Sequence, residues 1–150
     1  MRKVIISVKN LHKRYGNFHA VKGISFDVLE GEIFGLLGPN GAGKSTTLEI
    51  IETLREKTSG EIWVDGMNLD ESPNEIKKII GVQLQTSGYY PALNLTELIA
   101  LFAGLYNQKT DPLQLLDKVN LRDKAKAKYK EMSGGQKQRV MIAMAMCCEP

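Results

Sequence analysis

One nine-residue segment constrains this chain more than any other. Residues 38–46 read GPNGAGKST and follow the apolar run 33–37. The spacing matches GxxxxGK[ST], in which the backbone N–H groups of a glycine-rich loop surround nucleotide phosphates. Glycine adopts backbone angles that other residues avoid, so successive N–H groups can converge on one anion. The sequence therefore predicts a nucleoside triphosphate site ahead of a helix with Leu48, Ile51 and Leu54 on one face.

The polar residues of this loop have separate predicted roles. Lys44 brings a positive charge to the β and γ phosphates, and Ser45 offers a hydroxyl to Mg²⁺. The free N–H groups and the positive dipole end of the following helix also favour an anion. A glycine-rich turn that binds nothing needs neither side chain. The predicted nucleotide-binding residues of the loop are Gly38, Pro39, Asn40, Gly41, Ala42, Gly43, Lys44, Ser45 and Thr46.

A second motif lies near the other end of the chain. Residues 132–139 read MSGGQKQR and stand immediately before the apolar run 140–148. Ser133 and Gln136 have the spacing of a capping box, and the two glycines between them leave backbone N–H groups open to an anion. Considered alone, the segment also fits an ordinary capped helix.

Together with the phosphate loop, this motif resembles an ABC-type ATPase, and the resemblance extends over the whole chain. Tyr15, in KRYG, stands where the family has an adenine-stacking aromatic residue, and Gln85 stands where the family has its Q-loop glutamine. The resemblance implies that Lys44 and Gln85 serve catalysis and that Ser45 and Gln85 bind Mg²⁺. It further implies contacts to ATP held by a second subunit from Ser133, Gly134, Gly135 and Gln136.

The resemblance implies an α/β fold, a P-loop NTPase of ABC type. Its parallel core sheet would be incomplete here, beside an N-terminal antiparallel β layer and a helical subdomain. Alternating apolar residues over 4–28 and 61–64 independently favour the antiparallel layer. The continuous apolar run 33–37 predicts a strand buried on both faces of a parallel sheet, and 79–84 predicts another strand. The expected parts are a β-rich nucleotide-binding part over 1–85, a helical subdomain over 86–135, and the start of a return to the core over 136–150.

Several residues predict where helices begin. Pro73 and Pro112 suit the first position of a helix, and Asn94 with Glu97 forms a capping box. Between residues 95 and 106, apolar side chains recur with helical spacing, which is typical of a packed face. Since the resembled family uses this subdomain to receive membrane subunits, a partner-binding surface is the alternative interpretation.

The resemblance also indicates which catalytic groups the sequence lacks. In the family, the Mg²⁺-orienting aspartate, the water-activating glutamate and the switch histidine would follow residue 150. We therefore expect an N-terminal fragment of an ABC ATPase that binds nucleotide without turnover. His12 and His19 precede the phosphate loop in a hairpin-like segment, so we interpret them as surface or packing histidines.

Composition and the length of apolar stretches limit the classes of protein that the chain can belong to. A net charge of +3 gives no indication of nucleic-acid binding. The longest apolar stretch, 140–148, is far shorter than the roughly 20 residues of a membrane-spanning helix. No signal peptide pattern is present, which favours a cytoplasmic location. Cys147 and Cys148 are expected to be reduced thiols.

These inferences lead to one principal functional hypothesis. We expect an ATP-binding subunit of an ABC transporter that couples ATP binding and hydrolysis to solute movement across a membrane. Its expected ligands and partners are ATP, Mg²⁺, a second ABC ATPase subunit in a head-to-tail dimer and a transmembrane permease subunit at the inner face of the cell membrane. The alternatives are a soluble ABC-type ATPase acting on ribosomes or DNA, and a nucleotide-binding fragment that does not hydrolyse ATP.

Overall fold

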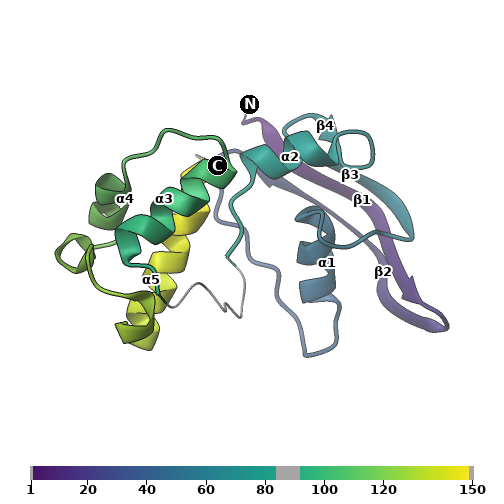
Figure 1. The fold of residues 1–150 in the computed structure, drawn as a ribbon. Helices are drawn as coiled ribbons and strands as arrows, with labels where there is room; N and C mark the ends of the chain where they lie inside the picture. Colours follow the sequence, from purple (N-terminus) through teal and green to yellow (C-terminus); the bar gives the residue numbers. More distant parts are fainter. Residues whose placement is uncertain (1, 84–91, 149–150) are drawn as a thin grey trace. The chain divides into compact units, whose positions relative to one another are not determined.

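The computed structural model of the chain describes residues 2–83 and 92–148 (Figure 1). The chain divides into two compact units, Met1–Lys77 and Lys78–Pro150. Gln85, which the sequence predicts to be a catalytic and metal-binding residue, lies outside the described residues.

The first unit is built on a four-stranded antiparallel sheet. Strands β1 (Val4–Tyr15) and β2 (Phe18–Leu29) form a long hairpin, and β3 (Ser59–Val64) and β4 (Met67–Asn68) complete the order β2-β1-β3-β4. This confirms the predicted antiparallel layer. It arises because side chains of alternating polarity bury one face of each strand.

Helix α1 (Lys44–Ile51) buries Thr47, Ile50 and Ile51 in this unit. The predicted helix face was wrong in part, because Leu48 is 47% exposed and Leu54 is 60% exposed. The helix ends at Ile51, and Thr53 then adopts a left-handed φ of 60°, which turns the chain away before Leu54. The predicted face spans seven residues, 48–54, and of its three apolar members only Ile51 is buried.

The predictions of core strands at 33–37 and 79–84 are also wrong. Residues 32–39 form no strand, and Ile33 and Leu37 are 101% and 91% exposed. Helix α2 (Pro73–Ile79) runs through the start of the second predicted strand, and residues 80–83 have no regular structure. A parallel strand needs hydrogen-bonded neighbours, and within the described residues none pairs with either segment.

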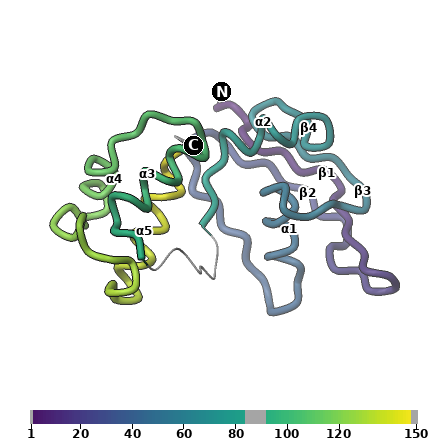
Figure 2. Tube along the Cα trace, in the orientation of Figure 1, coloured from purple at the N-terminus to yellow at the C-terminus, as the bar shows by residue number. Residues whose placement is uncertain are grey.

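The second unit is helical, as predicted. It contains α3 (Leu95–Leu105), α4 (Pro112–Lys118) and α5 (Gly134–Ala145), with short 3₁₀ helices η1 (Arg122–Lys124), η2 (Tyr129–Glu131) and η3 (Met146–Cys148). Figure 2 follows the chain through these elements. Their apolar side chains form one core, which includes Leu95, Leu98, Ile99, Leu115, Leu116, Leu121, Val140, Ala143, Met144 and Cys147.

The predicted helix starts are confirmed by their hydrogen bonds. The backbone N–H of Asn94 donates to Glu97 Oε2, and the backbone N–H of Glu97 donates to Asn94 Oδ1, both at 2.9 Å. Asp111 caps α4 by accepting a 2.9 Å bond from the backbone N–H of Leu113. Within the described ranges 2–83 and 92–148, no helix is long and apolar enough to cross a membrane.

Candidate functional site

The glycine-rich loop connects to α1 through two left-handed residues. Gly41 and Gly43 have φ values of 81° and 84°. A Cβ atom on Gly41 would meet no atom within 4 Å, whereas one on Gly43 would lie 2.5 Å from the carbonyl oxygen of Ala20. The backbone of Gly43 thus packs directly on β2. Glycine is required there both by the backbone angle and by the lack of space for a side chain.

The N-terminus of α1 has the features of an anion site. In the described part of the chain, no side chain caps this helix end at Gly43, and its first turn contains no acidic residue. Ser45 lies exposed in that turn. The first N–H groups of a helix have no partner within the helix, and the helix dipole makes this end positive. The turn therefore offers N–H donors and a hydroxyl to a negatively charged group.

Lys44 folds back over the loop that precedes it. Its Nζ donates hydrogen bonds to the carbonyl oxygens of Gly38 and Pro39, each at 2.7 Å. An ammonium group has three donors, so these two bonds leave capacity for a further acceptor. The positive charge is therefore held above the loop, close to the free end of α1.

The remaining loop residues complete an exposed turn. The backbone N–H of Ala42 donates to the carbonyl of Pro39 at 3.2 Å, and Asn40 lies exposed between them. Thr46 is half-buried in α1. All of the loop residues predicted from the sequence thus lie together around one helix end.

Tyr15 ends β1 and pairs with Phe18 across the hairpin turn. The residue is 40% exposed. The Lys13 ammonium lies 5.0 Å from the ring centroid, and the guanidinium carbon of Arg55 lies 5.6 Å from it. Ala20, which contacts Gly43, is two residues along β2 from Phe18, a distance of roughly 7 Å at the usual strand rise. An aromatic ring and a phosphate-type loop therefore occur in the same unit.

Residues 133–136 form the predicted capping box at the start of α5, in the second unit. The backbone N–H of Ser133 donates to Gln136 Oε1 at 2.9 Å, and the backbone N–H of Gln136 donates to Ser133 Oγ at 3.3 Å. Gly134 and Gly135 are exposed, and a Cβ atom on either would meet nothing within 4 Å. Their backbone is therefore open to solvent.

The two histidines, interpreted from the sequence as surface or packing residues, pack against each other. His12 Nδ1 and His19 Nε2 are 3.0 Å apart, and the rings stack with centroids separated by 5.1 Å. Desolvation of half-buried His19, followed by the positive charges of Arg14, His12 and Lys22, lowers its pKa. The Asn10 side chain, which the sequence reasoning missed, lies 3.1 Å from His12 Nε2.

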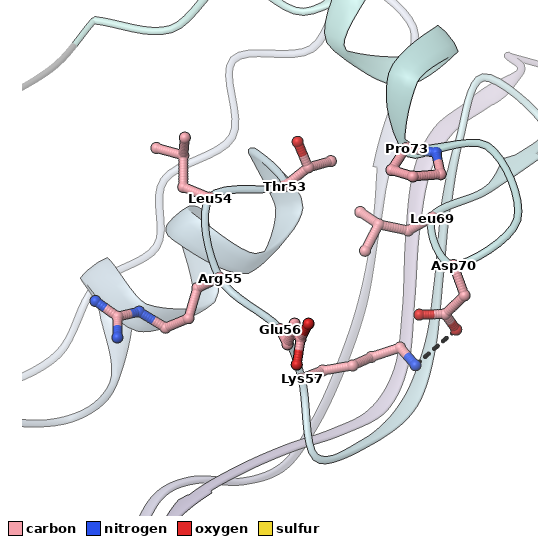
Figure 3. Close-up of a pocket in the computed structure, with 8 residues that line it drawn as sticks. All are labelled: Thr53, Leu54, Arg55, Glu56, Lys57, Leu69, Asp70 and Pro73. Atoms are coloured by element: carbon pink, nitrogen blue, oxygen red, sulfur yellow. Dashed lines mark ion pairs between the residues drawn. The ribbon is translucent and has the colours of Figure 1, made fainter.

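A separate open pocket of about 580 Å³ lies at the C-terminal end of α1 (Figure 3). Lys57 and Asp70 form a 2.7 Å ion pair at its edge. Helix α1 is about 12 Å long, so this pocket is at the opposite end from the phosphate loop. It is lined by Thr53, Leu54, Arg55, Glu56, Lys57, Leu69, Asp70 and Pro73.

A glycine-rich loop, a lysine and an uncapped helix end together define a P-loop nucleotide-binding module. Comparison with known proteins agrees with this class and makes it more specific. The family model described as "ABC transporter" matches residues 21–150. The chain belongs to this ABC transporter family.

Two curated relatives show the extent of the similarity. The linearmycin resistance ATP-binding protein LnrL of Bacillus subtilis (strain 168) is 38% identical over 97% of this chain and 49% of its own length. The methionine import ATP-binding protein MetN of Helicobacter acinonychis (strain Sheeba) is 36% identical over 98% of this chain and 48% of its own length. The chain thus spans about half the length of the curated relatives it matches.

Solved structures support the predicted fold class. An ATP-binding subunit of an ABC transporter superposes with a TM-score of 0.83 at 30% identity, covering 97% of this chain and 63% of that one. A dimeric bacterial ABC transporter cassette superposes with a TM-score of 0.81 at 31% identity, covering 97% and 70%. The α/β fold of an ABC-type P-loop ATPase is therefore confirmed.

Proposed function

We propose that this chain is the nucleotide-binding part of an ABC transporter ATP-binding subunit, which couples ATP binding and hydrolysis to solute movement across a membrane. The observation that carries the proposal is the uncapped N-terminus of α1 behind the glycine loop, with the Lys44 ammonium held beside it. The family match and the relatives named as ATP-binding proteins support the same interpretation.

In this proposal, the loop and α1 bind the triphosphate. Lys44 donates to the β and γ phosphates, and the backbone N–H groups of Gly41 and of residues 43–46 donate to the remaining phosphate oxygens. Ser45, exposed in the first turn of α1, would hold Mg²⁺ through its hydroxyl, with Gln85 as a second proposed ligand. Bound Mg²⁺ would neutralise part of the phosphate charge. The absence of an acidic residue from the first turn of α1 fits an anionic ligand.

The base is proposed to stack on Tyr15. Its half-exposed ring belongs to the same unit as the loop, and an aromatic face accepts any purine through stacking. We propose no other residue as a contact to the base.

The proposed partners are a second ATPase subunit and a membrane permease. The exposed backbone N–H groups of Gly134 and Gly135 can donate to the γ-phosphate of ATP bound by the other copy, and a dimeric ABC cassette among the similar structures supports this arrangement. Relatives named as import ATP-binding proteins support a permease partner, with the chain in the cytoplasm at the inner face of the membrane.

Hydrolysis is proposed for the complete ATPase and not for residues 1–150 alone. A catalytic base or a water-positioning residue must orient the attacking water, and neither the loop nor the first turn of α1 contains a carboxylate for this role. Phosphate release by this chain should therefore stay at the background rate. Turnover that Lys44→Ala abolishes would contradict this part of the proposal.

The binding proposal is tested by titrating Mg-ATP into the parent chain and into Lys44→Ala. Charge-assisted hydrogen bonds contribute roughly 1.5–3 kcal/mol each, so the variant should lose at least about tenfold in affinity. Lys9→Ala, which removes an exposed lysine from β1 of the same unit, is the control and should bind normally. An affinity of Lys44→Ala within threefold of the parent would contradict the assigned role.

A further inference from the structure

Arg55, four residues beyond the end of α1, pairs with Glu49 inside that helix. Arg55 Nε donates to Glu49 Oε2 at 2.6 Å, and the backbone N–H of Arg55 donates to the backbone carbonyl of Glu49 at 3.1 Å. The backbone N–H of Leu54 donates to the same carbonyl at 2.9 Å. Glu49 therefore holds both the main chain and the side chain of Arg55.

The guanidinium of this pair extends to the Tyr15 ring. Its central carbon lies 5.6 Å from the ring centroid, within the distance of about 6 Å at which cation–π attraction acts. The hydrogen bond to Glu49 is the main cause of the raised pKa of Arg55, and Tyr15 adds to it. Arg55 thus joins the end of α1 to the end of β1.

Lys13 also places a cation near the ring, at 5.0 Å, but the two cations are held differently. Lys13 has a flexible stem and stands two residues before Tyr15 on the same strand. Arg55 presents a rigid planar group whose orientation Glu49 fixes by hydrogen bonding. Arg55 is therefore better able to restrict the side-chain rotation of Tyr15.

We propose that Arg55, oriented by Glu49, is a positioning residue that holds the Tyr15 ring ready to stack on a nucleotide base. The inference rests on the proposed function, in which Tyr15 receives the base. A ring already held in one orientation loses less conformational freedom when the base binds. Helix α1 then serves both parts of the nucleotide, with the phosphate loop at its N-terminus and the Glu49–Arg55 pair at its C-terminus.

The test compares two ligands that differ by the base. Mg-ATP and Mg-tripolyphosphate are titrated into the parent chain, Arg55→Ala, Glu49→Gln and Glu49→Ala. Arg55→Ala should weaken Mg-ATP binding about two- to fivefold and leave Mg-tripolyphosphate binding unchanged. Glu49→Gln retains an oxygen acceptor for the guanidinium and should lose less affinity for Mg-ATP than Glu49→Ala. Lys13→Ala, which removes the other cation near the ring, is the matched control and should lose less affinity for Mg-ATP than Arg55→Ala.

The outcomes separate this inference from the proposed function. If Tyr15→Ala weakens Mg-ATP binding while Arg55→Ala binds as the parent does, the positioning role is wrong and the base site stands. Equal losses for both ligands in Arg55→Ala would show a purely structural role and would also overturn the inference. If Tyr15→Ala leaves Mg-ATP binding unchanged, both the positioning role and the proposed base contact are wrong. If Arg55→Ala does not fold, Arg55→Lys, which keeps the positive charge, is titrated with Mg-ATP and Mg-tripolyphosphate in its place.

Discussion

Replacing Gly43 by alanine tests how tightly the phosphate loop is fixed to the sheet. The added Cβ would lie 2.5 Å from the carbonyl oxygen of Ala20 and 3.0 Å from Val21 Cγ2. Neither the backbone carbonyl nor the β-branched side chain can move far without disturbing β2. Overpacking of this kind costs about 1–3 kcal/mol. The left-handed φ of 84° adds about 1–2 kcal/mol for a residue with a Cβ.

Gly41→Ala is the matched control because it shares only one of these two costs. Gly41 has a φ of 81°, but an added Cβ would meet nothing within 4 Å. We therefore expect Gly41→Ala to destabilise the chain by about 1–2 kcal/mol and Gly43→Ala by about 2–5 kcal/mol. The difference between the two variants isolates the contact with β2.

Urea unfolding followed by tryptophan fluorescence measures both free energies. The chain has one tryptophan, Trp63, which lies in β3 of the same unit as the loop. The midpoint and slope of each transition give the free energy of unfolding. Equal destabilisation by Gly43→Ala and Gly41→Ala would refute the packing argument, since only the backbone cost would then remain.

Two further predictions concern the base site and pH. Tyr15→Ala should weaken Mg-ATP binding by roughly 1–3 kcal/mol while Tyr15→Phe is tolerated, because stacking needs the ring and not the hydroxyl. If Phe were as damaging as Ala in a fluorescent-nucleotide competition assay, stacking would be the wrong explanation. The pKa of His19 is lowered in the folded chain from its ordinary value of 6.5, chiefly by desolvation. The unfolded chain then binds the proton more readily, so the contribution of His19 to stability is complete above pH 6.5 and is lost as the pH falls towards the lower folded value. Denaturation between pH 5 and 8 should show a weaker pH dependence for His19→Gln than for the parent, and identical curves would exclude His19 as the cause.

Local signals explain what the sequence could predict. The alternation of β1 and β2, the cap at Asn94, the proline start of α4 at Pro112, and the capping box at Ser133 depend on residues within a few positions of each other. Such patterns specify strands and helix ends without reference to the rest of the chain. The phosphate loop is also local, since nine consecutive residues contain the motif.

Features that depend on distant neighbours could not be predicted in this way. The apolar run 33–37 has the composition of a buried strand, yet strand formation requires pairing, which composition does not provide. The contact between Arg55 and Tyr15 joins residues forty positions apart and leaves no periodic pattern. The Glu49–Arg55 spacing of six also differs from the helical i, i+4 spacing that marks an ion pair in sequence.

The phosphate loop is supported both by residues close to it in sequence and by residues distant from it in sequence. On its C-terminal side, Gly43 packs on β2 and α1 buries Thr47, Ile50 and Ile51. On its N-terminal side, residues 33–37 pair with no strand within the described chain, but Phe34 stacks on Phe26 of β2 with the ring centroids 5.0 Å apart. A Cβ on Gly38 would meet only Ala42 Cβ and Lys44 Cδ, at 3.4 and 3.9 Å, which are both loop contacts. The phosphate site is therefore held to the sheet by α1 and Gly43 on one side and by the Phe34–Phe26 contact on the other. The bonds from Lys44 to the loop carbonyls hold the N-terminal end of the loop to α1.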